Sequence, residues 1–230
     1  GNIDLLFIDC AVNDRTNGRT SRERIRAVEG IVRHSLIINP NMDIVFLYFV
    51  DPWKMEDYRS GSVPAEIQDY ENIAEYYGIA SINLAKEVTY RIDAGEFTWE
   101  DDFKNLHPSP FGQELYFKAI KRFLETTWRN PLPGDAQIIA HPQPAEPLDP
   151  FSYYQAKLVD INQAELIQGW KMDSSWHPKD RKGTRQGFVN VPMLVAEEPN
   201  AILNFSFEGT AIGIFITAGP DTGIIEYSFD

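Results

Sequence analysis

The sequence predicts an α/β domain built on a parallel sheet, followed by a smaller all-β, sandwich-like domain. Through residue 130, short apolar runs alternate with helical periodicities, as in a parallel sheet covered by helices on both faces. Residues 131–150 hold six of the fifteen prolines, which favours an extended, semi-rigid linker. From residue 151, short β-like runs are separated by turns rich in Gly and Pro. The expected domains are therefore 1–130 and 151–230, joined by the linker 131–150.

Three apolar runs predict the strands of the parallel sheet. They cover residues 3–10, 44–50 and 79–84, and each has the near-continuous apolar character of a strand buried on both faces. Polar residues follow each run. We expect functional side chains in the loops at these carboxyl ends.

Local signals predict the helices between and after these strands. Thr20 and Glu23 form a capping box ahead of apolar residues at helical spacing. Ser109 can cap a last helix whose first turn holds Pro110. The predicted helices run from about residue 20 to 36, 64 to 77, 85 to 92 and 110 to 127.

The second domain shows β-type patterns. Residues 152–158 are β-like, and residues 201–207 and 211–217 flank a Glu-Gly-Thr turn in the manner of a hairpin. The runs at both ends of the chain, near residues 3–8 and 224–229, look like strands cut from a longer protein.

Composition restricts the classes of partner. The formal net charge is −13 and no basic stripe occurs, which argues against binding to nucleic acid. No apolar run approaches the ~18 residues of a membrane span. The single cysteine, Cys10, lies in an apolar run, where the role of a small buried hydrophobe is favoured over that of a reactive thiol. Neither a cofactor nor a metal site is predicted, and the sequence leaves the oligomeric state open.

His107 lies between an acidic cluster and the start of the last helix. Imidazole exchanges a proton near neutral pH, so a positioned histidine is a candidate general base. The alternative is a surface histidine in a Pro-rich turn. Asn13 and Asp51 favour the first interpretation, because they follow the first two strands and should lie on the same sheet edge as His107.

Two motifs in this order resemble blocks of the SGNH (GDSL-type) hydrolases. Val12-Asn13-Asp14 after a buried strand resembles the third block, and His107-Pro108-Ser109-Pro110-Phe111-Gly112 before a closing helix resembles the fifth. The resemblance covers a little over half of the chain. It implies a flavodoxin-like three-layer fold whose N-terminal strands are missing here.

The resemblance also implies roles. His107 would be the base, and the neutral amide of Asn13 would donate to the oxyanion, although Asn13 alone could equally be a turn residue. The family's nucleophilic serine would lie upstream of this chain. Lys104 stands where the family has the aspartate that orients the histidine, and Ala11 stands where it usually has glycine. Asp101, Asp102 or Asn105 could orient the ring instead, with Asp102 preferred.

Several residues are candidates for binding substrate. Asp14 and Trp53 follow the first two strands, and exposed aromatic rings in the second domain would offer flat faces to sugars. The aromatic candidates there are Tyr154, Trp170 and Trp176, for which burial in a β core is the favoured alternative. His177 and Asp180 are too few ligands for a metal site.

The expected function is that of an SGNH-type serine esterase that acts through an acyl-enzyme. A small acyl ester or an acetylated carbohydrate would be the substrate, and a carbohydrate substrate implies a secreted or periplasmic protein. The alternative is a non-catalytic carbohydrate-binding or interaction protein on a hydrolase-like scaffold.

Overall fold

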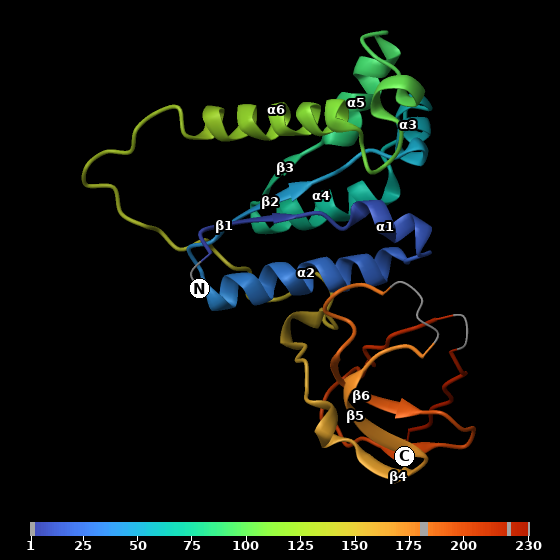
Figure 1. The fold of residues 1–230 in the computed structure, drawn as a ribbon. Helices are drawn as coiled ribbons and strands as arrows, with labels where there is room; N and C mark the ends of the chain where they lie inside the picture. The colour runs from blue at the N-terminus through green and yellow to red at the C-terminus, as the bar shows by residue number, and fades with distance from the viewer. Residues whose placement is uncertain (1–2, 180–183, 220–221, 230) are drawn as a thin grey trace. The chain divides into compact units, whose positions relative to one another are not determined.

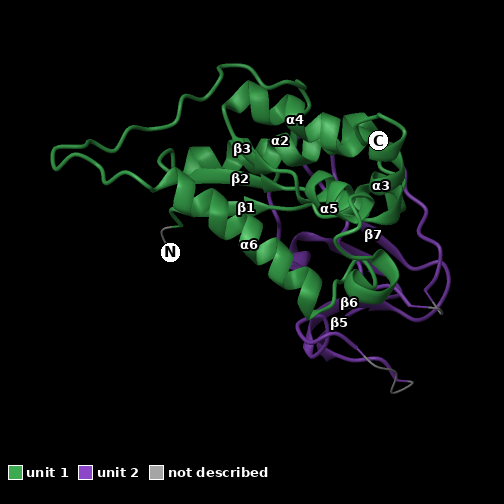
Figure 2. Cartoon of the chain, turned by 90° about the horizontal axis from the view of Figure 1, so that it is seen from above, with its two compact units in different colours: residues 1–156 green, residues 157–230 purple. Residues whose placement is uncertain are grey.

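The chain folds in two units, residues 1–156 and residues 157–230 (Figure 2). The computed structural model describes residues 3–179, 184–219 and 222–229. Asp180 lies outside the described residues. None of the described helices is both long enough and apolar enough to cross a lipid bilayer.

Three parallel strands form the centre of the first unit (Figure 1). They are β1 (Leu5–Ile8), β2 (Asp43–Leu47) and β3 (Ala80–Ile82), in the order β1-β2-β3. β2 is the central strand, and four of its five residues are buried. The predicted parallel sheet is therefore confirmed, with shorter strands than the apolar runs suggested.

Helices cover both faces of this sheet, as predicted. Figure 1 shows α2 (Ser21–Ile38) and α4 (Ala65–Tyr77) on one side and α6 (Pro110–Thr127) on the other. Thr20 and Glu23 form the predicted capping box at the start of α2. Pro64 is the N-cap of α4 and does not belong to its first turn. The remaining predicted helix is α5 (Leu84–Asp93).

Three short helices occupy segments that were expected to be loops or irregular chain. They are α1 (Ala11–Thr16), α3 (Pro52–Arg59) and the π-helix η1 (Trp99–Phe103). α1 begins three residues after the end of β1, and α3 begins five residues after the end of β2. The expected loops at the carboxyl edge of the sheet are thus largely helical.

Part of the Pro-rich linker folds back onto α2. We call residues 141–155, which include the 3-10 helix η2 (Tyr153–Gln155), the strap. Buried Glu29 accepts hydrogen bonds from the backbone N–H groups of Leu148 at 2.5 Å and Asp149 at 3.2 Å. Arg33 donates to two strap carbonyl oxygens. The first unit accordingly extends to residue 156, past the expected domain limit at residue 130 and the expected start of the β domain at residue 151.

The second unit contains two antiparallel strand pairs. β4 (Glu165–Gln168) pairs with β7 (Ile202–Asn204), and β5 (Trp170–Trp176) pairs with β6 (Val191–Ala196). The 3-10 helix η3 (Ile161–Gln163) precedes them.

Two sequence expectations for this region are wrong. The hairpin of residues 201–207 and 211–217 does not form. The strand in its first arm, β7, covers only Ile202–Asn204 and pairs with β4. Residues 211–217 contain no strand. Residues 152–158 hold η2 in place of a strand. The β-sandwich stays a prediction.

Candidate functional site

The carboxyl edge of the parallel sheet gathers the segments that carry the candidate residues. Figure 1 shows α1, α3 and the loop before α6 at this end of the sheet. The first turns of α6 are fixed there, because the backbone N–H of Val50 donates to the hydroxyl of Tyr116 at 3.2 Å. Three segments distant in sequence therefore reach one edge.

His107 lies in a short loop that is closed against η1. The backbone N–H of Ser109 donates to the carbonyl oxygen of Phe103 at 3.0 Å, and the Ser109 hydroxyl donates to that of Asp102 at 2.5 Å. Ser109 also caps α6, as the sequence predicted. The loop turns at Lys104, whose φ is +80°. His107 is exposed on this loop, where its ring is accessible to a ligand.

Close packing around Gly112 accounts for the glycine at the end of the His107–Gly112 motif. A Cβ at this position would lie 2.6 Å from the Cβ of Pro108 and 2.8 Å from the ring of Phe103. Phe103 is fully buried and cannot move aside cheaply. The glycine allows α6 to begin close to the histidine loop, so this part of the motif has a packing role.

None of the three residues predicted to orient the ring of His107 forms a hydrogen bond to it in the described chain. The carboxylate of Asp102 accepts from the backbone N–H of Thr98 at 2.8 Å. The side-chain oxygen of Asn105 accepts from the backbone N–H of His107 at 2.7 Å. Within the described chain, no hydrogen bond joins the imidazole to Asp101, Asp102 or Asn105. The structure therefore fixes the backbone of His107 and leaves its ring without an orienter in this conformation.

Asn13 and Asp14 lie on α1, not in a loop. Asn13 is exposed, and its side-chain amide makes no hydrogen bond to any residue that the structure describes. Asp14 accepts a hydrogen bond from the hydroxyl of Tyr70 on α4. Burial and this carboxylate both raise the pKa of Tyr70. Asn13 is thus free to donate to a ligand, whereas Asp14 holds α1 against α4.

Asp51 is buried and serves the fold. Its carboxylate caps α3 by accepting from the backbone N–H of Lys54 at 2.9 Å, and it pairs with the ammonium group of the same residue. Glu66 approaches this ammonium at 3.5 Å. All three side chains are almost fully buried. Asp51 therefore follows β2 as expected but is not accessible to substrate.

Trp53 lies on the surface of α3, with 43% of its area exposed. The guanidinium of Arg15 on α1 lies 5.9 Å from the centre of its ring and pairs with Asp57 of α3 at 2.7 Å. These contacts join α1 to α3. An exposed aromatic face therefore lies on the helix next to the one that carries Asn13.

Asp9 was missed by the sequence interpretation. It directly follows β1, and desolvation by the surrounding protein raises its pKa to about 6, with a further upward contribution from Asp14 that Lys54 opposes. An acidic residue at the end of an apolar strand was the available signal. Its neighbour Cys10 has a pKa raised to about 11, mainly by burial, which agrees with an unreactive thiol.

The aromatic candidates near the second domain differ in position. Trp170 and Trp176 are half-buried on β5, and Trp176 pairs with Val191 of β6. Tyr154 belongs to the strap in the first unit, where the guanidinium of Arg33 lies 4.8 Å from its ring centre. Tyr154 is thus not a residue of the β domain. Among the described residues, no cluster of three or more His, Cys, Asp or Glu could hold a metal ion.

Comparison with known proteins identified a structural relative. Family models and curated proteins gave no match to this chain. A solved structure, that of a two-domain esterase active on acetylated mannans, matches with a TM-score of 0.55 and 19% sequence identity. The match covers 76% of this chain and 43% of the esterase chain. The chain has the fold of this esterase over the matched part. It spans less than half of the esterase's length.

Proposed function

We propose that this chain belongs to a serine esterase of the SGNH type that removes acetyl groups from a carbohydrate. The observation that carries the proposal is the position of two segments. α1 with the free amide of Asn13, and the closed loop with exposed His107, both lie at the carboxyl edge of the sheet. The likeness to an esterase active on acetylated mannans supports this substrate class. A carbohydrate substrate would place the protein outside the cytoplasm, in a secreted or periplasmic location.

The proposed reaction proceeds in two steps. First, a ring nitrogen of His107 accepts the proton of a serine hydroxyl while the serine oxygen attacks the acetyl carbonyl carbon. The amide of Asn13 donates to the resulting oxyanion. The imidazolium then returns the proton to the sugar oxygen as the ester bond breaks, leaving an acetyl-serine.

The second step releases acetate. Water attacks the acetyl-serine while His107 accepts a proton from it, and the collapse of the second tetrahedral intermediate returns this proton to the serine oxygen. The serine itself is proposed to lie N-terminal to Gly1. The coding sequence upstream provides a direct check, because a Gly-Asp-Ser motif after an apolar strand is expected there.

The central experiment measures hydrolysis of an aryl acetate by the full-length protein. His107→Ala should lower kcat/KM by ~10²-fold or more, as expected for loss of a general base. The matched control is His141→Ala, because His141 pairs with Asp43 at the opposite, amino end of β2. If His107→Ala stays within about threefold of the wild type, the assignment of the base is wrong.

A parallel pair of variants tests the oxyanion role. Asn13→Ala should lower kcat by ~10²-fold to 10³-fold, with a smaller effect on KM. Asn17→Ala, at the end of the same short helix, is the control and should leave both constants unchanged. Equal effects of the two substitutions would assign Asn13 a structural role.

A second candidate function is carbohydrate binding without catalysis. The absence of an orienter hydrogen bond to the described imidazole favours it, together with Lys104 in the position of the family's aspartate. In this case Trp53, with its exposed ring, would be the residue that retains the sugar. Binding of acetylated mannan that is lost in Trp53→Ala, by a full-length protein without esterase activity, would support this second candidate.

A further inference from the structure

Tyr116 connects the start of α6 to the main chain at the centre of the sheet. Its side chain is buried, with only 8% of its area exposed. The hydroxyl accepts the hydrogen bond from the backbone N–H of Val50, a fully buried residue just beyond the end of β2. Buried backbone N–H groups are almost always paired, so this bond satisfies a requirement of the chain that leaves β2. It does so at the edge of the sheet where Asn13 and His107 lie.

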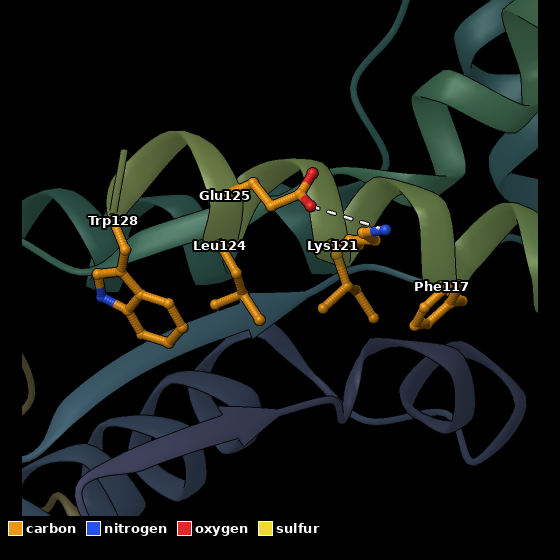
Figure 3. A pocket seen from close by; sticks show the side chains of 6 residues that line it. Phe117, Lys121, Leu124, Glu125 and Trp128 are labelled. Atoms are coloured by element: carbon orange, nitrogen blue, oxygen red, sulfur yellow. Dashed lines mark ion pairs between the residues drawn. The ribbon is translucent and has the colours of Figure 1, made fainter. Parts of the chain in front are cut away.

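The neighbouring residues of α6 have a different environment. Phe117, Lys121 and Glu125 lie on an open face of this helix (Figure 3), and Phe117 has 57% of its area exposed. Phe117 directly follows Tyr116 in the sequence. Of these two adjacent aromatic rings, that of Tyr116 is the one that packs in the interior.

The ring of Tyr116 also contacts the residue against which the histidine loop closes. Its centre lies 5.5 Å from the ring centre of Phe103 in an edge-to-face arrangement, and the ring of Trp99 stacks on Phe103 at 5.2 Å. Phe103 is fully buried, and its carbonyl oxygen accepts from the backbone N–H of Ser109 at 3.0 Å. Tyr116 and Phe103 therefore connect the main chain after β2 with the main chain two residues after His107.

The hydroxyl of Tyr116 lies near acidic residues that follow two strands. Burial raises the pKa of Tyr116 most, the hydrogen bond from Val50 lowers it, and the carboxylates of Asp9 and Asp51 raise it again. Asp9 follows β1, and Asp51 follows β2. The hydroxyl accordingly stays neutral at physiological pH, so its hydrogen bond with Val50 does not depend on the titration of Tyr116.

We propose that Tyr116 is a positioning residue for His107. By joining the main chain after β2 to the histidine loop, it sets the place of the imidazole relative to Asn13 and to the ester that is cleaved. This inference rests on the proposed esterase function and deepens it. Among the described residues no carboxylate holds the imidazole, so the placement of His107 depends on the backbone that carries it.

The first test is Tyr116→Phe in the full-length protein, with an aryl acetate as substrate. This variant keeps the ring on Phe103 and removes the acceptor of the Val50 amide. Reacting atoms have to lie about 3–3.5 Å apart, and a misplacement of about 1 Å can cost ~10²-fold in rate. We expect kcat to fall about tenfold and KM to stay within about twofold, because placement of the base matters in the transition state.

Tyr77→Phe is the matched control. Tyr77 is also buried, and its hydroxyl donates to Glu29 at 2.6 Å and accepts from Arg33 at 3.0 Å. It lies at the end of α4, which covers the opposite side of the sheet from α6 (Figure 1). Its loss should lower the thermal stability and leave kcat unchanged. Equal falls of kcat in Tyr116→Phe and Tyr77→Phe would overturn the proposal, because both would then reflect a general loss of stability.

A double-mutant cycle measures whether Tyr116 acts through His107. In the His107→Ala background, Tyr116→Phe should reduce the residual hydrolysis no further, since the base that it positions is gone. A fall of about tenfold in both backgrounds would overturn the proposal, because the hydroxyl would then act independently of the base.

Phe103→Leu tests the second half of the connection. It loosens the contact with Tyr116 and should also lower kcat about tenfold. Phe46→Leu is the control, because Phe46 is equally buried but lies on β2 and packs against Tyr70 of α4. A wild-type kcat in Phe103→Leu would overturn the proposed connection through this ring.

Hydrogen exchange provides a readout that does not need hydrolysis. Tyr116→Phe should raise the exchange rates of the Val50 and Ser109 amides about tenfold, and Tyr77→Phe should not. Unchanged exchange at Ser109 would overturn the link between Tyr116 and the loop.

The failures of the two proposals are distinguishable. Faster exchange at Ser109 in Tyr116→Phe, in a protein whose hydrolysis survives His107→Ala, rejects the esterase base and retains the link to the loop. Hydrolysis that depends on His107 but has the same kcat in Tyr116→Phe as in the wild type rejects the positioning role alone.

Discussion

Replacing Glu29 should release the strap from α2. The side chain is fully buried and accepts hydrogen bonds from the hydroxyl of Tyr77 at 2.6 Å and from the backbone N–H groups of Leu148 and Asp149. Glu29→Ala leaves these donors without their acceptor. An unpaired buried donor costs about 1–3 kcal/mol. Since the two amides are only partly buried, we expect a total loss of about 3 kcal/mol rather than the sum of three full penalties.

Hydrogen exchange of the strap measures this loss locally. A loss of about 3 kcal/mol corresponds to a ~10²-fold rise in the exchange rates of the Leu148 and Asp149 amides. Glu29→Gln retains one carbonyl oxygen and should have a smaller effect. Glu75→Ala, at an exposed position of α4, is the control. Strap exchange in Glu29→Ala within about threefold of the wild type would refute the assignment of Glu29 as the anchor.

Three further predictions concern packing and titration. Gly112→Ala should destabilise the first unit by about 1–3 kcal/mol in urea unfolding, since the clash with Pro108 outweighs the ~1 kcal/mol gain in helix propensity. Gly30→Ala should accelerate proteolysis of the strap, because its Cβ would lie 3.0 Å from the backbone of Tyr153; unchanged cleavage would argue against this contact. The pKa of Asp9 is raised from 3.8 to about 6 in the folded chain, so the contribution of Asp9 to stability should fall as pH rises from about 4 to 6. Asp9→Asn should lack this fall. Urea midpoints that change with pH by the same amount in the variant and in the wild type would contradict the prediction.

The features that the sequence predicted well depend on neighbouring residues. The capping box of Thr20 and Glu23 and the cap at Ser109 each involve residues three positions apart, so their chemistry can be recognised in the sequence. The buried character of β2 follows in the same way from a continuous apolar run.

The features that were missed depend on distant partners. The strap binds Glu29 across about 120 residues, and proline density alone gives no indication of this contact. Leu203 pairs with Leu166, 37 positions earlier in the chain, whereas the hairpin that the local pattern predicts for residues 201–217 does not form. At the candidate site, the sequence predicted Asn13 and His107 at one sheet edge. The hydrogen bond from Thr98 to Asp102 spans only four residues, and it was missed because the π-helix η1 was not predicted.

The loop of His107 fixes the backbone of this residue and leaves its side chain free to rotate. Asn105 holds its backbone N–H, and Ser109 closes the loop on η1, so the backbone has a set position. The imidazole can still rotate about its two side-chain torsions. Ordering a side chain of this size costs at most about 1 kcal/mol, far less than ordering a loop would. Under the proposed function, His107 would therefore need only a rotation of its side chain, and no rearrangement of the main chain, to accept a proton from the serine.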